Sequence, residues 1–347
     1  MGNRKAGLIL LIVLCSFLVS IPVIERVKAE SNTIVVRDDY GHIQDAINNA
    51  SEGDTIYVKK GTYHENLVIN KSISLIGEDL DTTIIDGAPS EGYRIPIKIQ
   101  CDNVAVSGFK ILYGYTGIQM WDVQNCTISG NRIAGGQHGI ELSSSEYNNI
   151  TGNIFESIGL SSAIRLYGAS HNFVCRNHIS SCVEGIQLIG SHDNTVTENT
   201  IKDCMRVTIN VGIRLQNSDR NTVIRNNITR SGTGLTIYAA NNNTIYHNNF
   251  LYNDVQISAN EWYALTFGHN VSVNTINENY WSDYNGTDTD GDGIGNTPYI
   301  IDENNQDNNP LIEPAIIPEF PSWTILPLLL VATLMVIIYK KRLPKKT

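Results

Sequence analysis

The most specific chemical motif in this sequence is a short acidic segment near its carboxyl end. Aspartates stand at positions 1, 3 and 5 of a loop with glycine at position 6, a spacing that lets oxygen ligands surround a calcium ion. Position 12, which carries a glutamate in helix–loop–helix calcium sites, is Tyr299 here. The sequence therefore predicts a structural Ca²⁺ site, with a simple acidic turn as the alternative. Its ligands are Asp288, Asp290, Asp292, the Ile294 carbonyl and Asn296.

A second group of residues suits carbohydrate chemistry. Two carboxylates about 5 to 9 Å apart supply the acid and the base for glycoside cleavage, and the catalytic candidates are Asp122, Glu141 and Arg165. Charges on the outside of a repeat protein are usually just solvated, so the pattern favours sugar binding without cleavage over catalysis. The candidate sugar-binding residues are Trp121, Tyr147 and Tyr167.

Copper binding is not favoured by the pattern. It requires a cluster of imidazole or sulfur ligands. His171 and His192 are placed in successive repeats but one position out of register, and Met120 and Met205 do not pair with them. We expect solvated histidines here.

These residues must be positioned by a repeat, which dominates the sequence between residues 104 and 280. Asparagine recurs in a short phrase such as Asn194-Thr-Val-Thr-Glu-Asn-Thr-Ile, at steps of 22 to 31 residues. A period near 22 with short alternating segments is typical of a solenoid, and it predicts a right-handed parallel β-helix. We expect the asparagines to hydrogen-bond along the stack as a ladder. They are Asn131, Asn153, Asn177, Asn199, Asn226, Asn248 and Asn279.

Each repeat contains a second segment that alternates as a strand does, for example Gly139-Ile-Glu-Leu. The isoleucine is expected to face inward and the charged residue outward. The preceding glycine is expected to supply a turn with φ > 0. Cys182 and Cys204 should stack in adjacent coils as buried, unreactive thiols.

Composition and charge restrict the partners. The net charge is −10 and the repeat region has no Lys/Arg-rich stretch, so a nucleic-acid partner is not expected. Eight Asn-x-Ser/Thr sequons permit surface glycosylation without proving it. They begin at Asn49, Asn70, Asn125, Asn149, Asn227, Asn242, Asn270 and Asn285.

The two ends of the chain predict its location. A basic start and an apolar run from Ala6 to Ile24 indicate a secretory signal peptide, with an uncleaved anchor as the alternative. Residues 323–339 are apolar and precede five cations, which predicts a single membrane span with a cytoplasmic carboxyl terminus. Together with Pro318-Glu-Phe it resembles the archaeal PEF-CTERM sorting signal. The body is expected on the outer side of the membrane.

Residues 34–87, the asparagine repeats and the segment Asn279-Tyr-Trp-Ser-Asp resemble the NosD-like β-helix family, whose domain is also called the CASH domain. The resemblance covers roughly residues 34–310. It implies an extracytoplasmic right-handed β-helix, and NosD itself is associated with copper delivery to nitrous oxide reductase. The motif Gly61-x-Tyr63-x-Glu65 is also similar to the opening of pectin methylesterases, where it is structural.

The sequence predicts one solenoid with flanking segments and favours a non-enzymatic role. We expect a membrane-anchored surface protein that binds envelope or extracellular polysaccharide. The alternatives are a polysaccharide lyase, hydrolase or epimerase, and a NosD-like copper-delivery protein. The expected segments are a signal peptide (1–29), a helical cap with the first coils (30–96), the repeats (97–284), the calcium loop (285–303), a linker (304–322), the membrane helix (323–339) and a basic tail (340–347).

Overall fold

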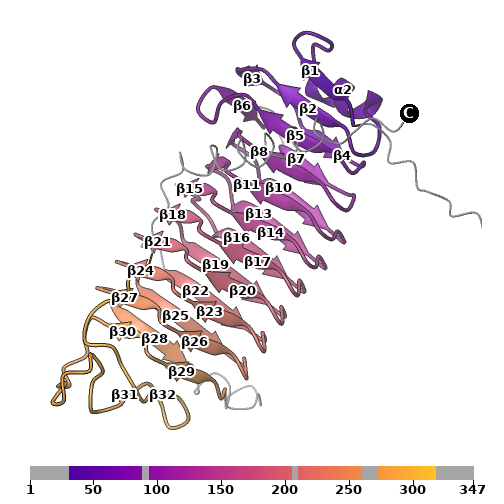
Figure 1. Ribbon diagram of the computed structural model, residues 1–347. Coiled ribbons are helices and arrows are strands. Elements are labelled where there is room, and N and C mark those ends of the chain that lie inside the picture. The colour runs from indigo at the N-terminus through magenta and orange to yellow at the C-terminus, as the bar shows by residue number, and fades with distance from the viewer. Residues whose placement is uncertain (1–30, 88–93, 205–209, 260–271, 318–347) are drawn as a thin grey trace, which may run out of the picture. The chain divides into compact units, whose positions relative to one another are not determined.

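The computed structural model describes residues 31–87, 94–204, 210–259 and 272–317. From β2 to β30, consecutive strands of the chain go to three different sheets in rotation, so each sheet gains one strand per coil (Figure 1). Neighbouring strands are parallel throughout, except that β31 is antiparallel to β32. The described residues thus form a right-handed type of parallel β-solenoid with about ten turns and almost no helix, as the repeats predict.

The strands of each sheet follow the stack from one end to the other. The thirteen-stranded sheet contains β1 (Thr33–Val36), β2 (Thr55–Val58), β5 (Ser74–Gly77), β8 (Ala105–Ser107), β11 (Thr127–Ser129), β14 (Asn149–Thr151), β17 (Phe173–Cys175), β20 (Thr195–Thr197), β23 (Thr222–Ile224), β26 (Thr244–Tyr246), β29 (Thr275–Asn277), β32 (Gln306–Asp307) and β31 (Tyr299–Ile300). The nine-stranded sheet contains β28 (Val255–Ala259), β25 (Thr233–Tyr238), β22 (Val211–Gln216), β19 (Glu184–Ile189), β16 (Ser162–Tyr167), β13 (His138–Ser143), β10 (Thr116–Trp121), β7 (Ile97–Ile99) and β4 (Leu67–Ile69). The ten-stranded sheet contains β3 (Gly61–Tyr63), β6 (Thr83–Asp86), β9 (Lys110–Leu112), β12 (Arg132–Ala134), β15 (Ile154–Glu156), β18 (His178–Ser180), β21 (Thr200–Lys202), β24 (Asn227–Thr229), β27 (Asn249–Leu251) and β30 (Tyr280–Trp281).

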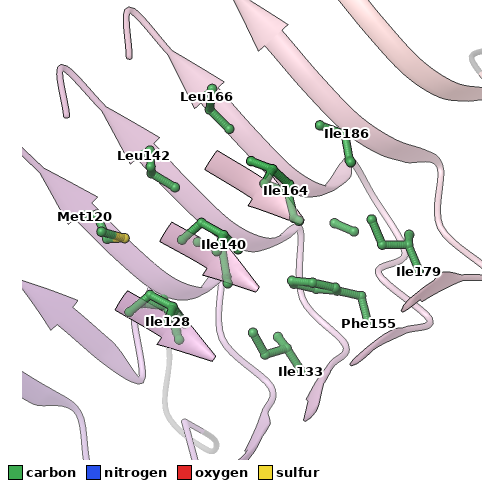
Figure 2. Close-up of a cluster of buried hydrophobic side chains, with 14 of the residues drawn as sticks. Met120, Ile128, Ile133, Ile140, Leu142, Phe155, Ile164, Leu166, Ile179 and Ile186 are labelled. Carbon is green, nitrogen blue, oxygen red and sulfur yellow. The ribbon is translucent and has the colours of Figure 1, made fainter. Parts of the chain in front are cut away.

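The core is a continuous column of apolar side chains between the three sheets. Figure 2 shows equivalent residues of successive coils lying one above the other, for example Met120, Leu142 and Leu166. The predicted inward residues, such as Ile140 and Ile164, are fully buried. Each coil covers the apolar face of the next, which a single coil cannot do for itself.

The predicted asparagine ladder is confirmed, and it connects every coil from β12 onward. Asn199 is typical: its backbone N–H and its Nδ2 both donate to Oδ1 of Asn226, each at 3.0 Å. Its Nδ2 also donates to the Val174 carbonyl at 2.9 Å, while its own Oδ1 accepts from Asn177. The amide therefore satisfies buried groups in the coils on both sides.

A second ladder, which the sequence analysis did not predict, runs along the other turn of the thirteen-stranded sheet. Its members bond in the same way, with Asn172 donating from N and Nδ2 to Oδ1 of Asn194 at 2.8 and 3.2 Å. Both ladders end at acceptors in the terminal segment. In the first ladder, Asn279 N donates to the buried carboxylate of Asp307. In the second ladder, Asn274 N donates to the amide oxygen of Asn305. A terminal carboxylate suits the first ladder because its last member has no further coil to which it must donate.

Four residues in a typical coil adopt the left-handed backbone conformation, and many of them are not glycine. In one coil they are Asp122 (φ 55°), Asn125 (57°), Gly130 (60°) and Gly135 (76°). This conformation is unfavourable by roughly 1 to 2 kcal/mol for residues other than glycine. It is held here because turn amides bond to the next coil, as Asp122 N does to the Ser143 carbonyl at 3.0 Å.

The glycines that open the strands of the nine-stranded sheet have a different role from the one predicted. Gly117, Gly139 and Gly185 lie within the strands and do not have positive φ, so the expected turn conformation is wrong. A Cβ at Gly139 would lie 2.4 Å from the carbonyl oxygen of Ala163 in the next coil. Close packing of backbone between coils explains these glycines, although Ala163 shows that one coil accommodates a methyl group.

The amino-terminal end is capped by α2 (Ile43–Asn49), as predicted. Ile43, Ala46 and Ile47 are fully buried against the first coil. Glu65 accepts hydrogen bonds from the N–H groups of Ile43 and Gln44 at 3.1 and 3.0 Å, which stabilises the start of the helix. The Gly-x-Tyr-x-Glu motif is thus structural in this chain too.

Cys182 and Cys204 are fully buried thiols in adjacent coils, as predicted. Burial raises the pKa of the Cys204 thiol, which keeps it protonated and unreactive.

The predicted signal peptide, the segment 323–339 and the basic tail lie outside the described residues. Within the described residues, no helix has the length and apolar character needed to cross a membrane.

The ladder generates a stability prediction. We expect Asn199→Ala to lower the free energy of unfolding by roughly 3 to 5 kcal/mol, because several buried groups lose their partners at about 1 to 3 kcal/mol each. Urea unfolding followed by far-UV circular dichroism measures this loss. The matched change Asn70→Ala, at an exposed position, should shift the midpoint little. Equal stability of the two variants would contradict the ladder's role.

Candidate functional site

The outer face of the nine-stranded sheet carries rows of polar and aromatic side chains set by the strand register. The central row consists of Gln119, Glu141, Arg165, Gln187 and Arg214, which are direct partners in successive coils. A second row lies two residues further along each strand and contains Trp121, Ser143 and Tyr167. A third row lies three residues before the central one and contains Thr116, His138, Ser162 and Glu184.

Glu141 and Arg165 are brought together, as the sequence suggested. Arg165 Nη1 lies 3.7 Å from Glu141 Oε1, and the two side chains are 26% and 14% exposed. Glu141 Oε2 also accepts a long hydrogen bond from the Thr116 hydroxyl at 3.4 Å. These contacts are longer than the 2.7–2.9 Å typical of charge-assisted hydrogen bonds, so the pair is loosely held.

Asp122 does not join them. It lies in the exposed turn after β10, three residues past Gln119, which is the register partner of Glu141. That offset corresponds to roughly 10 Å along the strand. The acid–base pair suggested for Asp122 and Glu141 is therefore not assembled in register.

His138 is a site residue that the sequence analysis missed. Its ring is buried, with Nδ1 at 3.1 Å from Ser162 Oγ and Nε2 at 3.4 Å from Arg165 Nη1. Because a guanidinium can only donate, Nε2 accepts and the proton lies on Nδ1. Burial, and then the charge of Arg165, lower the pKa of His138 to about 4. The ring is neutral at neutral pH and orients Arg165.

Glu184 and Arg214 form a second, tighter ion pair two coils away. Arg214 Nη2 lies 2.8 Å from Glu184 Oε1, and the carboxylate is almost completely buried. Burial raises the pKa of Glu184, and the Arg214 charge opposes that shift. Arg165 Nε, Glu184 Oε2 and Arg214 Nε are buried without a hydrogen-bond partner. A half-buried polar network with unused capacity is typical of binding sites rather than of a simple solvated surface.

Two of the predicted aromatic residues lie beside this network. Trp121 and Tyr167 are 61% and 52% exposed and occupy the same row two coils apart. The Arg165 guanidinium carbon lies 5.2 Å from the centre of the Tyr167 ring, a cation–π distance. Tyr147 lies elsewhere, in the turn after β13, where it stacks on His171 at 5.1 Å.

A shallow pocket of about 490 Å³ borders the opposite edge of the same face. Tyr113 and Leu160 on its wall are 62% and 76% exposed. Tyr115, also on the wall, meets the His138 ring edge-on at 6.3 Å between centroids. The charged network thus has apolar surface on both sides.

The predicted calcium ligands also come together. Carboxylate oxygens of Asp288, Asp290 and Asp292 lie within 4.8 Å of one another. Asp288 accepts the N–H groups of Gly291 and Gly293 at 2.7 and 2.9 Å, and these bonds lower its pKa. Asn296 lies beside the cluster with its nitrogen toward it: Nδ2 is 3.4 Å from Asp290 Oδ1, while Oδ1 accepts from Thr289 N and Oγ1 at 2.6 and 2.8 Å. The Ile294 N–H bonds to Asp292 Oδ1. Three carboxylates in a tight glycine turn suit a hard cation.

The histidines considered for copper do not converge. His171 and His192 are in adjacent coils, and the backbone N–H of the first donates to the carbonyl of the second at 3.2 Å. His192 Nδ1 is occupied by the Asp219 N–H at 3.0 Å. In the part of the chain that the structure describes, the aspartate cluster is the one group of three or more potential metal-binding side chains.

Most of the predicted glycosylation sites are accessible. Asn149 and Asn227 lie in strands β14 and β24 and are half-buried, and Asn270 is outside the described residues. The exposed sites are Asn49, Asn70, Asn125, Asn242 and Asn285.

Comparison with known proteins gives a family match over more than two thirds of the chain. The model of the family described as periplasmic copper-binding protein (NosD) matches residues 47–286. A cell surface glycoprotein of Methanothermus fervidus is 37% identical over 105 residues, which are 30% of this chain and 17% of that protein. A probable pectinesterase/pectinesterase inhibitor 6 of Arabidopsis thaliana is 39% identical over 74 residues, 18% of this chain and 13% of the relative. The chain therefore spans less than a fifth of these curated relatives. An alginate lyase from Paenibacillus has 16% identity and a TM-score of 0.45, over 65% of this chain and 93% of that one.

The buried histidine generates a pH prediction. The pKa of His138 in the folded protein lies below the ordinary value of 6.5. Between about pH 6.5 and 4, His138 is therefore protonated in the unfolded chain but neutral in the folded protein. The stabilising contribution of neutral His138 is complete above pH 6.5 and is lost as the pH falls toward 4. We expect His138→Gln to flatten the acid side of the stability profile in denaturant titrations, and exposed His42→Gln to leave that side unchanged. An unaltered slope in His138→Gln would contradict the assignment.

Proposed function

This chain belongs to the NosD family of parallel β-helix proteins, and from that premise we propose that it is a membrane-anchored surface protein that binds polysaccharide. The proposal places the solenoid outside the cytoplasmic membrane. The secretory start and the apolar segment 323–339 support that placement. Two of the comparisons agree with it: the family is described as periplasmic, and one relative is described as a cell surface glycoprotein.

The observation that carries the proposal is the pair of exposed rings, Trp121 and Tyr167, in register beside a half-buried charged network. Exposed aromatic rings that line up on one face offer apolar surface that a ligand can cover. Sugar rings offer an apolar face for stacking and hydroxyl groups for Glu141, Arg165 and their neighbours. A solenoid repeats such a surface along its length, which suits a polymeric ligand.

A binding role is favoured over cleavage because the suggested acid–base pair is not assembled. Asp122 is roughly 10 Å along the strand from the register position of Glu141. Glu141 is already paired with Arg165 at 3.7 Å. Copper delivery is not proposed, because the aspartate cluster among the described residues offers carboxylate oxygens, which suit hard cations rather than copper.

We further propose that the Asp288 loop binds Ca²⁺ as a structural ion. The loop lies between the last coil and the predicted membrane segment. Tyr299, at position 12 of the loop, is not a ligand: its hydroxyl donates to Asp283 and its ring stacks on Trp281 at 4.5 Å between centroids. Asp302, the next carboxylate along the chain, is not a ligand either: its Oδ1 accepts from the N–H groups of Asn304 and Asn305 at the ladder end. The proposed ligands are the three aspartates, the Ile294 carbonyl and water. Asn296 joins them only when its amide turns, because its Oδ1 accepts from Thr289.

The polysaccharide proposal predicts the outcome of a glycan-array experiment on the full-length protein in detergent. We expect binding to a subset of polysaccharides without release of reducing ends. Trp121→Ala and Tyr167→Ala should each weaken that binding about tenfold, because each removes a stacking surface. Phe173→Ala is the matched control, since Phe173 is 42% exposed on the thirteen-stranded sheet. Turnover that disappears in Glu141→Gln would show instead that the protein is an enzyme.

The calcium proposal predicts sensitised terbium luminescence, since Tyr284 packs against Gly295 of the loop. Tb³⁺ bound at the loop should emit on tyrosine excitation, and added Ca²⁺ should displace it at submillimolar to millimolar concentration. Asp290→Asn should abolish the signal, whereas exposed Asp254→Asn should not. Emission that persists in Asp290→Asn would contradict the site.

A further inference from the structure

We propose that the ligand of the nine-stranded face is an acidic glycan rich in uronate, held with its chain parallel to the solenoid axis and with a carboxylate on Arg165. This inference rests on the proposed function and specifies its ligand. It is carried by three observations on described residues: the charge balance of the face, the unequal strength of its two ion pairs and the spacing of its aromatic rings.

The face collects cations on a protein that is otherwise acidic. Lys98, Arg165 and Arg214 lie in the central row, where strand register places them in line. They are opposed by the carboxylates of Glu141 and Glu184. The face therefore has an excess of positive charge on a chain whose net charge is −10. An anionic polymer is attracted to such a face and repelled by the rest of the surface.

Arg165 is the cation with capacity for a ligand. Arg214 is held by Glu184 through Nη2 at 2.8 Å, whereas the two contacts of Arg165, with Glu141 and His138, are 3.7 and 3.4 Å and both use Nη1. Its side chain is 26% exposed. A guanidinium can bind a ligand carboxylate through two parallel hydrogen bonds, and these are stronger than the long contacts that Arg165 makes now. Neutral His138 holds the guanidinium in place without competing for the anion.

Tyr167 supplies the sugar-binding surface next to that charge. Its ring lies against the Arg165 guanidinium carbon at 5.2 Å and is 52% exposed. Because the guanidinium covers one face of the ring, a pyranose that packs along the exposed edge of Tyr167 would bring a ring carboxylate toward Arg165, two residues back along the same face of the strand. A neutral sugar stacked in the same way would leave the guanidinium without its partner.

The direction of the glycan follows from the position of Trp121. It occupies the same row as Tyr167, two coils earlier, with the small side chain of Ser143 between them. Two coils correspond to about 10 Å along the stack, which is the length of a disaccharide unit in an extended glycan. A chain parallel to the axis can stack on both rings. A chain that crossed the strands would meet only one of them.

The test uses the full-length protein in detergent and oligomers of galacturonate, mannuronate and guluronate from two to eight residues long. Each oligomer is paired with its carboxyl-reduced form, which has the same length and linkage but no charge. Isothermal titration measures affinity. We expect at least one acidic series to bind at least tenfold more tightly than its reduced partner, with affinity rising from the dimer to the tetramer.

The variants assign the contacts. Arg165→Gln should weaken binding of the acidic oligomer about tenfold and leave the reduced form unchanged, because only the carboxylate contact is lost. Trp121→Ala should lower the affinity for the tetramer and leave the affinity for the dimer unchanged, because the dimer binds at Tyr167 and does not reach Trp121. Arg176→Gln is the matched control, since Arg176 pairs with Glu198 in the turn after β17 of the thirteen-stranded sheet, away from the nine-stranded face.

The outcomes separate this inference from the proposed function. Equal binding of acidic and reduced oligomers, with loss in Tyr167→Ala but not in Arg165→Gln, would overturn the acidic ligand and keep sugar binding. Loss of affinity in Trp121→Ala for the dimer as well would overturn the axial direction. If no uronate oligomer binds to a protein that does bind neutral glycans on the array, the acidic ligand is overturned and the proposed function is kept. No binding to any glycan would overturn both.

Discussion

In-register stacking of successive coils is the constraint on which every other feature of this protein depends. It is enforced by buried asparagine amides that bond to the coil before and the coil after. Asn199 accepts from Asn177 and donates to Asn226 and to the Val174 carbonyl. A shift of one residue would leave several buried donors and acceptors unsatisfied. The same shift would also turn the core side chains outward. The ladders and the core therefore select one register together.

Stacking in register tolerates insertions at particular places. The steps from Asn199 to Asn226 and from Asn248 to Asn279 exceed the usual length, yet the ladder hydrogen bonds across them are 3.0 Å. The two longer steps lie between β21 and β22 and between β28 and β29, and the strands on either side keep their register with the neighbouring coils. A solenoid can in this way acquire loops beside its faces while the faces remain regular. Regular faces in turn align side chains from separate coils, which is how Glu141, Arg165 and Tyr167 come to be neighbours.

The sequence predicted those features that depend on period alone. The ladder from Asn131 to Asn279, the inward isoleucines and the stacked cysteines all follow from residues recurring at equivalent positions. The helical cap follows instead from the spacing of Ile43, Ala46 and Ile47 on one helix face. The aspartate cluster also follows from spacing, because its ligands are local in the sequence. The contact of Glu141 with Arg165 could be predicted because both occupy the same place in adjacent repeats.

Other features depend on local geometry that the period does not encode. The second ladder lies at the first asparagine of each repeat, and a closer reading of that column could have found it. The glycines in the strands of the nine-stranded sheet are needed because the backbones of adjacent coils lie close together there, and the sequence does not show that contact. His138 occupies the first position of a strand, where residue type varies from Thr116 to Ser162, so nothing in the repeat identifies it. Asp307 caps the ladder from the segment predicted to be a linker.

The most direct test of this account is hydrogen exchange of the backbone amides, resolved along the chain by mass spectrometry. Stacked coils in one register predict a continuous run of strongly protected amides that includes the ladder donors from Cys126 to Asn279. Rapid exchange at the ladder amides of the central coils, with protection confined to isolated segments, would contradict it.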